Sequence, residues 1–378
     1  MQAAFPIKHR DDYFMRVAID LARNGLGTTH PNPMVGALVV SEGEIVGEGW
    51  HEKAGGPHAE VNALAAAGAR AKGATLYVTL EPCSTFGRTP PCTDAIERAG
   101  IARVVAGARD PNPLHAGRGY AILRNAGIEV REDVLAEDCE DLNPIFNHAM
   151  RHNTPLMAGK IATSIDGRIA SRTGESKWIT GDAAREHAHL LRRYYPAIGV
   201  GAGTVLKDDP RLTSRLPGRG EWCPRRFVFD RTLRSVTAPL PALYSDEFRA
   251  KTCVVTSPAA PAERLAMLRD GGVGIDVIAT VGAAFWKEFS DRLAAQGLQG
   301  ILIEGGSALL SSILEAGMLD YLYAYRAPIV FADDRAVPAL TGASPGSPRE
   351  CWRLEKVRNE VFGDDVLTRG WLSRTRNE

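Results

Sequence analysis

Four side chains with the spacing of a catalytic zinc site stand out in this sequence. His58 and Glu60 are separated by one residue, and Cys83 and Cys92 follow, each directly after a proline. Zn²⁺ accepts imidazole and thiolate ligands in a tetrahedron, and a catalytic site keeps one position for water. His58, Cys83 and Cys92 would be the three ligands, while the carboxyl group of Glu60 would carry protons as an amino group is hydrolysed from a ring. The spacing therefore predicts a zinc-dependent deaminase site.

Each of these residues, taken alone, has a plainer explanation. A lone histidine is more often a capping or core residue, and a lone cysteine is usually a small buried hydrophobe. The four residues together, in this order, favour the metal site. A regulatory protein that keeps zinc only for structure remains an alternative, but Glu60 argues against it because a structural zinc site requires no such carboxylate.

Two helix starts are needed to position these residues. Residues i and i+2 lie about 200° apart on a helix, so His58 and Glu60 cannot share a face in mid-helix. A Gly-Gly-Pro sequence directly before His58 interrupts the chain, and the alanine-rich run at 60–69 favours a helix after it. A proline pair likewise precedes Cys92, where a helix N-terminus would favour the thiolate. We therefore expect two helix N-termini to face one metal ion.

The segment between the two cysteines extends the zinc signature. Eight residues separate Cys83 from Cys92, whereas the common zinc deaminase signature has two. With this segment, the chain resembles the deaminase half of the bifunctional riboflavin biosynthesis deaminase/reductase family. The motifs that carry the resemblance are Leu80-Glu81-Pro82-Cys83-Ser84, Gly87-Arg88-Thr89-Pro90-Pro91-Cys92, Pro31-Asn32-Pro33-Met34-Val35-Gly36-Ala37, Gly49-Trp50-His51 and Arg109-Asp110-Pro111-Asn112-Pro113.

This resemblance implies a fold and substrate contacts for the first half of the chain. The fold would be a cytidine-deaminase-like, three-layer α/β/α domain. Asn32, His51 and Arg88 would hold the ring and the phosphoribosyl group of the substrate. Thr85 stands where the family usually has histidine.

The hydrophobic pattern of the first half agrees with such an α/β arrangement. It predicts strands at 35–40, 44–48, 75–80 and 102–106, and helices at 60–69, from Cys92, before Gly127 and at 134–150. A polar break at 151–155 follows. We therefore place the deaminase domain at residues 1–152 and a second domain at 153–378.

Strands and helices alternate in the second half, which predicts a mainly parallel sheet covered by helices. The expected strands are 156–162, 197–201, 226–230, 252–256, 274–278 and 300–304, and the expected helices are 182–194, 261–270, 283–296 and 307–316. Residues 216–220 are expected to form an exposed loop. A glycine-rich turn at 303–307 suits a pyrophosphate, although most such turns only join two elements.

The second half resembles the reductase half of the same family, whose fold is similar to dihydrofolate reductase. The motifs are Lys160, Ser164-Ile165-Asp166-Gly167, Ser176-Lys177-Trp178-Ile179-Thr180, Thr204-Val205-Leu206-Lys207-Asp208-Asp209-Pro210 and Glu304-Gly305-Gly306. The resemblance implies that NADPH contacts Ala162, Trp178, Thr204, Asp208, Gly306 and Ser307. It implies that the substrate contacts Ser176, Arg192, Leu212, Arg215 and Glu304.

Three arginines have specific alternatives. Arg192 and Arg215 can fork onto a phosphate, but Arg192 belongs to an Arg-Arg pair on a predicted helix and, without the resemblance, a solvated helix face would be preferred. Arg231 stands where the family commonly has a small hydroxyl residue. It either binds the 2′-phosphate of NADPH or points into solvent from a strand end.

Length and composition exclude several classes of protein. At 378 residues the chain exceeds the roughly 250–300 residues at which a single core stops growing. No apolar run approaches a membrane span, and the first residues lack a signal peptide pattern, so we expect a cytoplasmic protein. Equal numbers of basic and acidic residues, 45 each, argue against a nucleic-acid surface. The expected partners are a small-molecule substrate and further copies of the chain.

The sequence thus predicts a bifunctional enzyme of riboflavin biosynthesis. It would deaminate 2,5-diamino-6-(5-phosphoribosylamino)pyrimidin-4-one with zinc and then reduce the ribosyl group to ribityl with NADPH. The alternative is a cytidine- or guanine-type zinc deaminase fused to an unrelated reductase. The long segment between the cysteines argues against that alternative, and an assay with free nucleosides distinguishes the two.

Overall fold

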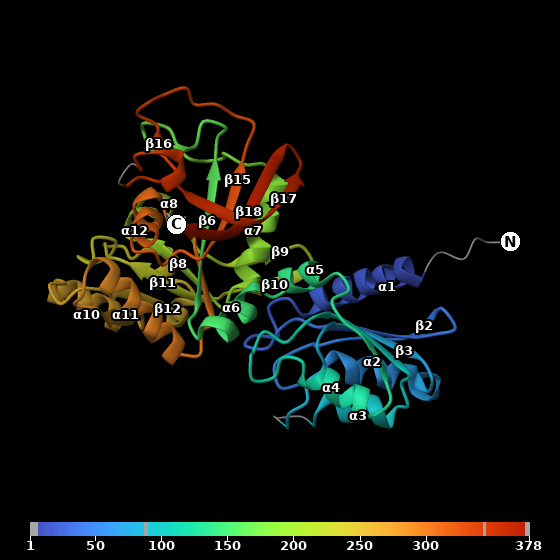
Figure 1. Ribbon diagram of the computed structural model, residues 1–378. Helices are drawn as coiled ribbons and strands as arrows, with labels where there is room; N and C mark the ends of the chain where they lie inside the picture. The colour runs from blue at the N-terminus through green and yellow to red at the C-terminus, as the bar shows by residue number, and fades with distance from the viewer. Residues whose placement is uncertain (1–6, 87–89, 343–344, 375–378) are drawn as a thin grey trace. The chain divides into compact units, whose positions relative to one another are not determined.

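The computed structural model describes residues 7–86, 90–342 and 345–374, and its chain divides into two compact units, Met1–Asn153 and Thr154–Glu378. Both units are α/β structures (Figure 1). No helix in the described ranges is long and apolar enough to cross a membrane.

The first unit is built on a five-stranded sheet with the order β2-β1-β3-β4-β5. Strand β1 is antiparallel to β2 and β3, whereas β3, β4 and β5 are parallel. The elements are α1 (Ile7–Ala22), β1 (Gly36–Ser41), β2 (Glu44–Trp50), α2 (Ala59–Ala67), β3 (Thr75–Leu80), α3 (Cys92–Arg98), β4 (Arg103–Ala108), α4 (Arg118–Asn125), β5 (Glu129–Arg131), α5 (Ala136–Asp141) and α6 (Pro144–His152).

Helices cover both faces of this sheet, which confirms the three-layer prediction (Figure 1). Glycines in the strands permit two of these helices to pack closely on the sheet. A Cβ atom at Gly36 would collide with the backbone of Ala18 in α1, and one at Gly49 would collide with the backbone of Ala63 in α2. The two helices therefore pack directly on the backbones of β1 and β2.

The predicted single helix at 134–150 is wrong, because two helices, α5 and α6, replace it. Pro144 occupies the first position of α6 and has no N–H with which to continue the helix before it. The side chain of Asn143 binds both the N–H and the carbonyl of Met34, at 2.8 Å each. The break thus fixes the segment that leads into β1.

The second unit contains a nine-stranded sheet with the order β13-β12-β11-β8-β14-β6-β15-β18-β17. Its elements are β6 (Leu156–Thr163), β7 (Arg168–Ala170), α7 (Asp182–Tyr194), β8 (Ala197–Gly201), α8 (Ala202–Asp208), β9 (Ser214–Leu216), β10 (Arg219–Trp222), β11 (Arg225–Phe229), α9 (Ala242–Ser245), β12 (Thr252–Thr256), α10 (Ala262–Asp270), β13 (Gly274–Val277), α11 (Gly282–Ala295), β14 (Gly300–Ile303), α12 (Ser307–Glu315), β15 (Tyr321–Arg326), β16 (Val337–Pro338), β17 (Trp352–Phe362) and β18 (Asp365–Arg374).

The prediction of a mainly parallel sheet is confirmed from β13 through β15, and each predicted strand and helix is present, although β15 itself was not predicted. The sheet then ends in an antiparallel hairpin, β17–β18, that the sequence analysis did not identify. The predicted loop at 216–220 is wrong in part, because β9 and β10 pair across it.

The carboxyl ends of the parallel strands lie along one side of this sheet and carry residues of the candidate site. β8 ends at Gly201, and the carboxyl ends of β11 and β14 lead into Asp230 and Glu304. The chain order reverses here, because β14 returns to lie between β8 and β6. Ligands of open α/β sheets bind outside the carboxyl ends of strands at such a reversal.

Candidate active sites

The first candidate site joins the two predicted helix starts. His58 directly precedes α2 and Cys92 is the first residue of α3, as expected. The Nδ1 atom of His58 lies 3.3 Å from the Sγ atom of Cys92 and 3.5 Å from that of Cys83. The three ligand atoms lie within 4.8 Å of one another. One imidazole and two thiols gathered this closely are a donor set that fits a tetrahedral zinc ion with a fourth position open.

Glu60 lies in the first turn of α2, beside this cluster, and is 4% exposed. Burial raises its pKa to about 7, and the nearby Cys83 contributes in the same direction. A hydrogen bond from Cys92 lowers the pKa of the Cys83 thiol. A carboxyl group that titrates near neutrality can both accept and deliver a proton.

Two of the three predicted substrate contacts of this unit adjoin the cluster. The Nδ1–H of His51 donates to the carbonyl of Pro57 at 2.9 Å, and its Nε2 accepts from Asn32 Nδ2 at 3.1 Å. Burial lowers the pKa of His51, which agrees with this neutral form. The rings of His51 and His58 meet edge to face, with centroids 5.4 Å apart. Arg88 lies outside the described residues.

Glu81, to which the sequence analysis gave no role, anchors a segment next to the cluster. Its Oε2 accepts the N–H groups of Asp110 and Gly117 at 3.2 and 2.9 Å, and its Oε1 accepts that of Gly119 at 3.0 Å. Glu81 is buried two residues before Cys83. The sequence signal for this role was a carboxylate directly after an apolar strand, because a buried charge requires partners.

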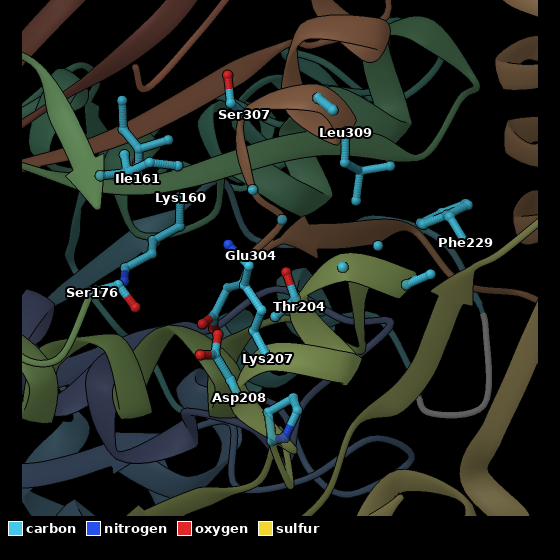
Figure 2. Close-up of a pocket in the computed structure, with 18 of the residues that line it drawn as sticks. Lys160, Ile161, Ser176, Thr204, Lys207, Asp208, Phe229, Glu304, Ser307 and Leu309 are labelled. Carbon is cyan, nitrogen blue, oxygen red and sulfur yellow. The ribbon is translucent and has the colours of Figure 1, made fainter. Parts of the chain in front are cut away.

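The second candidate site is a cavity of ≈ 1290 Å³ in the second unit (Figure 2). All residues predicted for the reductase half line it. They are Ala162, Trp178, Thr204, Asp208, Arg231, Gly306 and Ser307 for the cofactor, and Ser176, Arg192, Leu212, Arg215 and Glu304 for the substrate. The structure thus brings together residues from distant parts of the sequence.

Arg192 and Glu304 form a two-pronged ion pair at this cavity. Nε and Nη2 of Arg192 donate to the two carboxylate oxygens of Glu304 at 2.8 and 2.9 Å. The Arg192 side chain is 17% exposed, so the solvated face considered for it is wrong. Burial alone would raise the pKa of Glu304, but Arg192 and then Lys160 hold it at about 2. The guanidinium group of Arg192 therefore binds a carboxylate group in this structure.

Arg215 remains available for an anion. Its Nη1 donates to Thr213 Oγ1 at 2.7 Å, and no carboxylate pairs with it within the described ranges. Arg215 lines the cavity. Burial lowers the pKa of its guanidinium, and the nearby positive charge of Arg192 lowers this pKa further.

The strand-to-helix turns of the cavity fit a dinucleotide. Gly306 directly precedes α12, and a Cβ atom added there would meet no atom within 4 Å. The hydroxyl of Ser307, the next residue, is buried and has no hydrogen-bond partner among the described residues. Thr204 and Asp208 lie on α8, which begins directly after β8. An unpartnered hydroxyl at the N-terminus of a helix suits a phosphate oxygen.

Arg231 is held at the rim of the cavity. Its Nη1 donates to the carbonyl of Thr280 at 3.1 Å, and its guanidinium lies 5.8 Å from the ring centroid of Phe285. Arg234, Lys160 and Lys207 also line the cavity, and the sequence analysis assigned no role to any of them. Arg234 follows the end of β11, whereas Lys207 lies on α8 and Lys160 lies within β6, so no common sequence signal identified them.

The comparisons with known proteins agree for both halves. The family model of the RibD C-terminal domain matches residues 155–368, and that of the cytidine and deoxycytidylate deaminase zinc-binding region matches residues 8–108. The riboflavin biosynthesis protein RibD of Aquifex aeolicus is 42% identical over 96% of this chain and 98% of its own length. That of Escherichia coli is 39% identical over 94% of this chain and 98% of its own.

Solved structures are similar over nearly the whole chain. RibD of Acinetobacter baumannii has a TM-score of 0.80 and 36% identity, covering 97% of this chain and 100% of its own. The diaminohydroxyphosphoribosylaminopyrimidine deaminase/5-amino-6-(5-phosphoribosylamino)uracil reductase of Thermotoga maritima has a TM-score of 0.78 and 35% identity, covering 97% and 99%.

Proposed function

The chain belongs to the RibD family of bifunctional riboflavin biosynthesis enzymes, and on that premise we propose which of its residues carry the two reactions. It is a zinc-dependent pyrimidine deaminase and an NADPH-dependent reductase. The close approach of His58, Cys83 and Cys92 beside the buried Glu60 is the observation that carries the first assignment.

His58, Cys83 and Cys92 would hold the zinc ion, which would supply a water molecule that ionises near neutral pH. Glu60 would take a proton from the attacking water and deliver protons to the ring nitrogen and the departing amine. The carbon–nitrogen bond to the amino group breaks, a carbonyl forms, and ammonia leaves. The buried position and raised pKa of Glu60 support this role.

Asn32 and His51 orient the pyrimidine in this reaction. The hydrogen bond between them and the bond from His51 to Pro57 keep both side chains in place beside His58. Arg88 would contribute a charge to the phosphoribosyl group. Because the histidine that the family usually has is Thr85 here, the remaining ring contacts rest on Asn32 and His51.

In the second unit, NADPH would supply a hydride to the carbon of the open-chain imine of the ribosyl group, whose nitrogen would take up a proton. The glycine turn before Ser307, together with Ala162, Trp178, Thr204, Asp208 and Arg231, would line its binding site. Glu304, ionised and fixed by Arg192, retains lone pairs for the ribityl hydroxyls or amines. Arg215 would bind the phosphate, while Ser176 and Leu212 contact the rest of the substrate.

Lys160 determines the order of the two reactions. An ammonium group donates hydrogen bonds and accepts none. Deamination replaces an amino group of the ring, which is a donor, with a carbonyl, which is an acceptor. Lys160, which faces the same cavity as Glu304, therefore favours the deaminated ring (Figure 2). The chain would accept the pyrimidine in the reductase only after the deaminase has acted.

One assay tests the whole assignment. The zinc-loaded protein is incubated with 2,5-diamino-6-(5-phosphoribosylamino)pyrimidin-4-one and NADPH, and we expect ammonia release to precede NADPH oxidation. Cytidine and guanine serve as controls, because a cytidine- or guanine-type deaminase would act on them. Ammonia release from either control at a rate above that of the pyrimidinone would contradict the assignment.

We also propose that deamination belongs to residues 1–152 and reduction to residues 153–378, and that the enzyme is a cytoplasmic homo-oligomer without a nucleic-acid or membrane partner. An edge strand with two exposed valines, Val357 and Val361 in β17, supports association between copies. Light scattering after size-exclusion chromatography tests the assembly, since a monomer at micromolar concentration would contradict it.

A further inference from the structure

The ammonium group of Lys160 lacks a fixed hydrogen-bond partner. It lies on β6 and faces the reductase cavity (Figure 2). No residue that the structure describes hydrogen-bonds to its Nζ atom. That atom lies 5.5 Å from the ring centroid of Tyr325. This ammonium group therefore lies over an aromatic face and not against a fixed acceptor.

Tyr325 is held rigidly enough to provide such a surface. It lies on β15, which pairs with β6 so that Tyr325 is opposite Ala162 and Tyr323 is opposite Lys160. Lys160 and Tyr325 thus project from the same face of neighbouring strands. Tyr325 is 1% exposed, and its hydroxyl lies 2.7 Å from Nδ1 of His187.

His187 completes the arrangement from a different element. It lies on α7 and stacks on Phe362 at the end of β17, with centroids 4.4 Å apart and an interplanar angle of 21°. Burial lowers its pKa, so the hydrogen bond joins a neutral ring to the Tyr325 hydroxyl. Side chains from α7, β15 and β17 therefore fix one aromatic face beneath Lys160.

The charges around the two groups are accounted for. Glu304, from the end of β14, and Arg192, from α7, face Lys160. Glu360 and Arg369, from β17 and β18, face His187 and pair with each other at 2.6 Å. The charges of Glu360 and Arg369 act on His187 in opposite directions. The specific interaction between His187 and Tyr325 is therefore their hydrogen bond.

We propose that Tyr325 and His187 are positioning residues of the reductase: their hydrogen bond fixes the aromatic face that aims the Lys160 ammonium at the ring carbonyl of the deaminated substrate. The inference rests on the role proposed above for Lys160. An ammonium over a desolvated ring is held by the ring's negative face. Tilting that ring would turn the donor away from the substrate while leaving NADPH in place.

A double-mutant cycle tests the hydrogen bond. Tyr325→Phe and His187→Leu each remove it and keep an aromatic ring at position 325. With pre-deaminated substrate, we expect each variant to lower kcat/KM about three- to tenfold with an unchanged KM for NADPH. The double variant should lose no more than either single variant, because the same bond is lost. Losses that multiply in the double variant, or a normal kcat/KM in either single variant, would overturn the proposal.

A pH profile gives a readout that simple destabilisation does not move. Tyr325→Leu removes the ring, so the ammonium of Lys160 loses a stabilising contact and its pKa falls. We expect the basic limb of kcat/KM for the pyrimidine to move to lower pH by about one unit. If this variant does not fold, the cycle above decides alone.

Two controls separate the possible failures. Tyr244→Phe removes another buried hydroxyl of the same unit, 2.7 Å from Ser235 and outside the cavity lining, and should change neither kinetics nor pH profile. Lys160→Met tests the proposed role of Lys160 itself. If Lys160→Met reduces activity while the Tyr325 and His187 variants do not, this inference fails and the proposed function stands. If Lys160→Met is active with normal discrimination, the role of Lys160 fails.

Discussion

Arg192 and Glu304, 112 positions apart in the sequence, meet in a two-pronged ion pair that is almost shielded from solvent. The depressed pKa of Glu304, about 2 against an ordinary 4.5, makes this pair a source of pH-dependent stability. A carboxyl group whose pKa falls on folding stabilises the fold above its unfolded value, and this contribution is lost as the pH falls toward the folded value.

We therefore expect Glu304→Gln to destabilise the second unit by about 3 kcal/mol at pH 7, because Arg192 is left buried without its partner. The difference from the unmodified protein should shrink as the pH falls from about 4.5 toward 2. Urea unfolding followed by tryptophan fluorescence measures it, since Trp50 is the one tryptophan of the first unit and the other five lie in the second. A difference that stays constant with pH would show that Glu304 is not held ionised.

Cys83→Ala and Cys92→Ala should each lose zinc and deaminase activity together. Each removes one of three ligands, and the remaining pair cannot hold the ion tightly. Metal analysis of the unmodified protein should give about one Zn²⁺ per chain. Cys139→Ala is the matched control, because Cys139 is a buried free thiol of the same unit outside the cluster. Full zinc retention in either ligand variant contradicts the assignment.

Glu60→Gln should keep the zinc and lose deamination. The amide preserves the shape of the side chain but cannot shuttle a proton, so we expect kcat to fall by roughly 10² to 10⁴. Ammonia release and zinc content, measured on the same preparation, test the expected loss of activity and the expected retention of zinc. Near-normal turnover would mean that another group moves the proton.

Damage in one unit should leave the other reaction intact. Glu60→Gln should reduce pre-deaminated substrate at the normal rate, and Glu304→Ala should release ammonia at the normal rate, because the two sites lie in separately packed units. Parallel assays of ammonia and NADPH on both variants test this. If either folded variant loses both activities, the sites are not independent.

Arg231→Ala should raise the KM for NADPH and leave that for NADH unchanged, because the 2′-phosphate is the group that the guanidinium would pair with. The expected loss is about 1.5–3 kcal/mol, or roughly 10- to 150-fold. Arg249→Ala is a suitable control, since Arg249 is a surface arginine that does not line the cavity. Equal changes for both cofactors would assign Arg231 to the rim alone.

Elements with strong local signals were predicted well from the sequence. The helix Asp182–Tyr194 and the strands Thr75–Leu80, Ala197–Gly201 and Thr252–Thr256 have the predicted bounds, because each is an apolar or amphipathic run with breaks on both sides. The hairpin β17–β18 was missed. The edge strand β17 carries charged residues at many positions and is largely exposed, so its pattern lacks a continuous apolar face.

Some features of the candidate sites were likewise predictable from the sequence, and others were not. The zinc cluster was predictable because His58, Glu60, Cys83 and Cys92 are near in sequence and typical of one chemistry. The pairing of Arg192 with Glu304 was not, because it depends on how α7 and the end of β14 meet after folding. The cluster of Lys160, Tyr325 and His187 likewise exists only across paired strands and a helix.

The anchor formed by Glu81 has a consequence for how this enzyme tolerates sequence change. Glu81 binds only backbone N–H groups of the segment from Asp110 to Gly119. Any residue other than proline supplies the same donors, so the course of this segment does not depend on most of its side chains. Substitutions at Leu114 and His115 should therefore leave the backbone course of this segment in place.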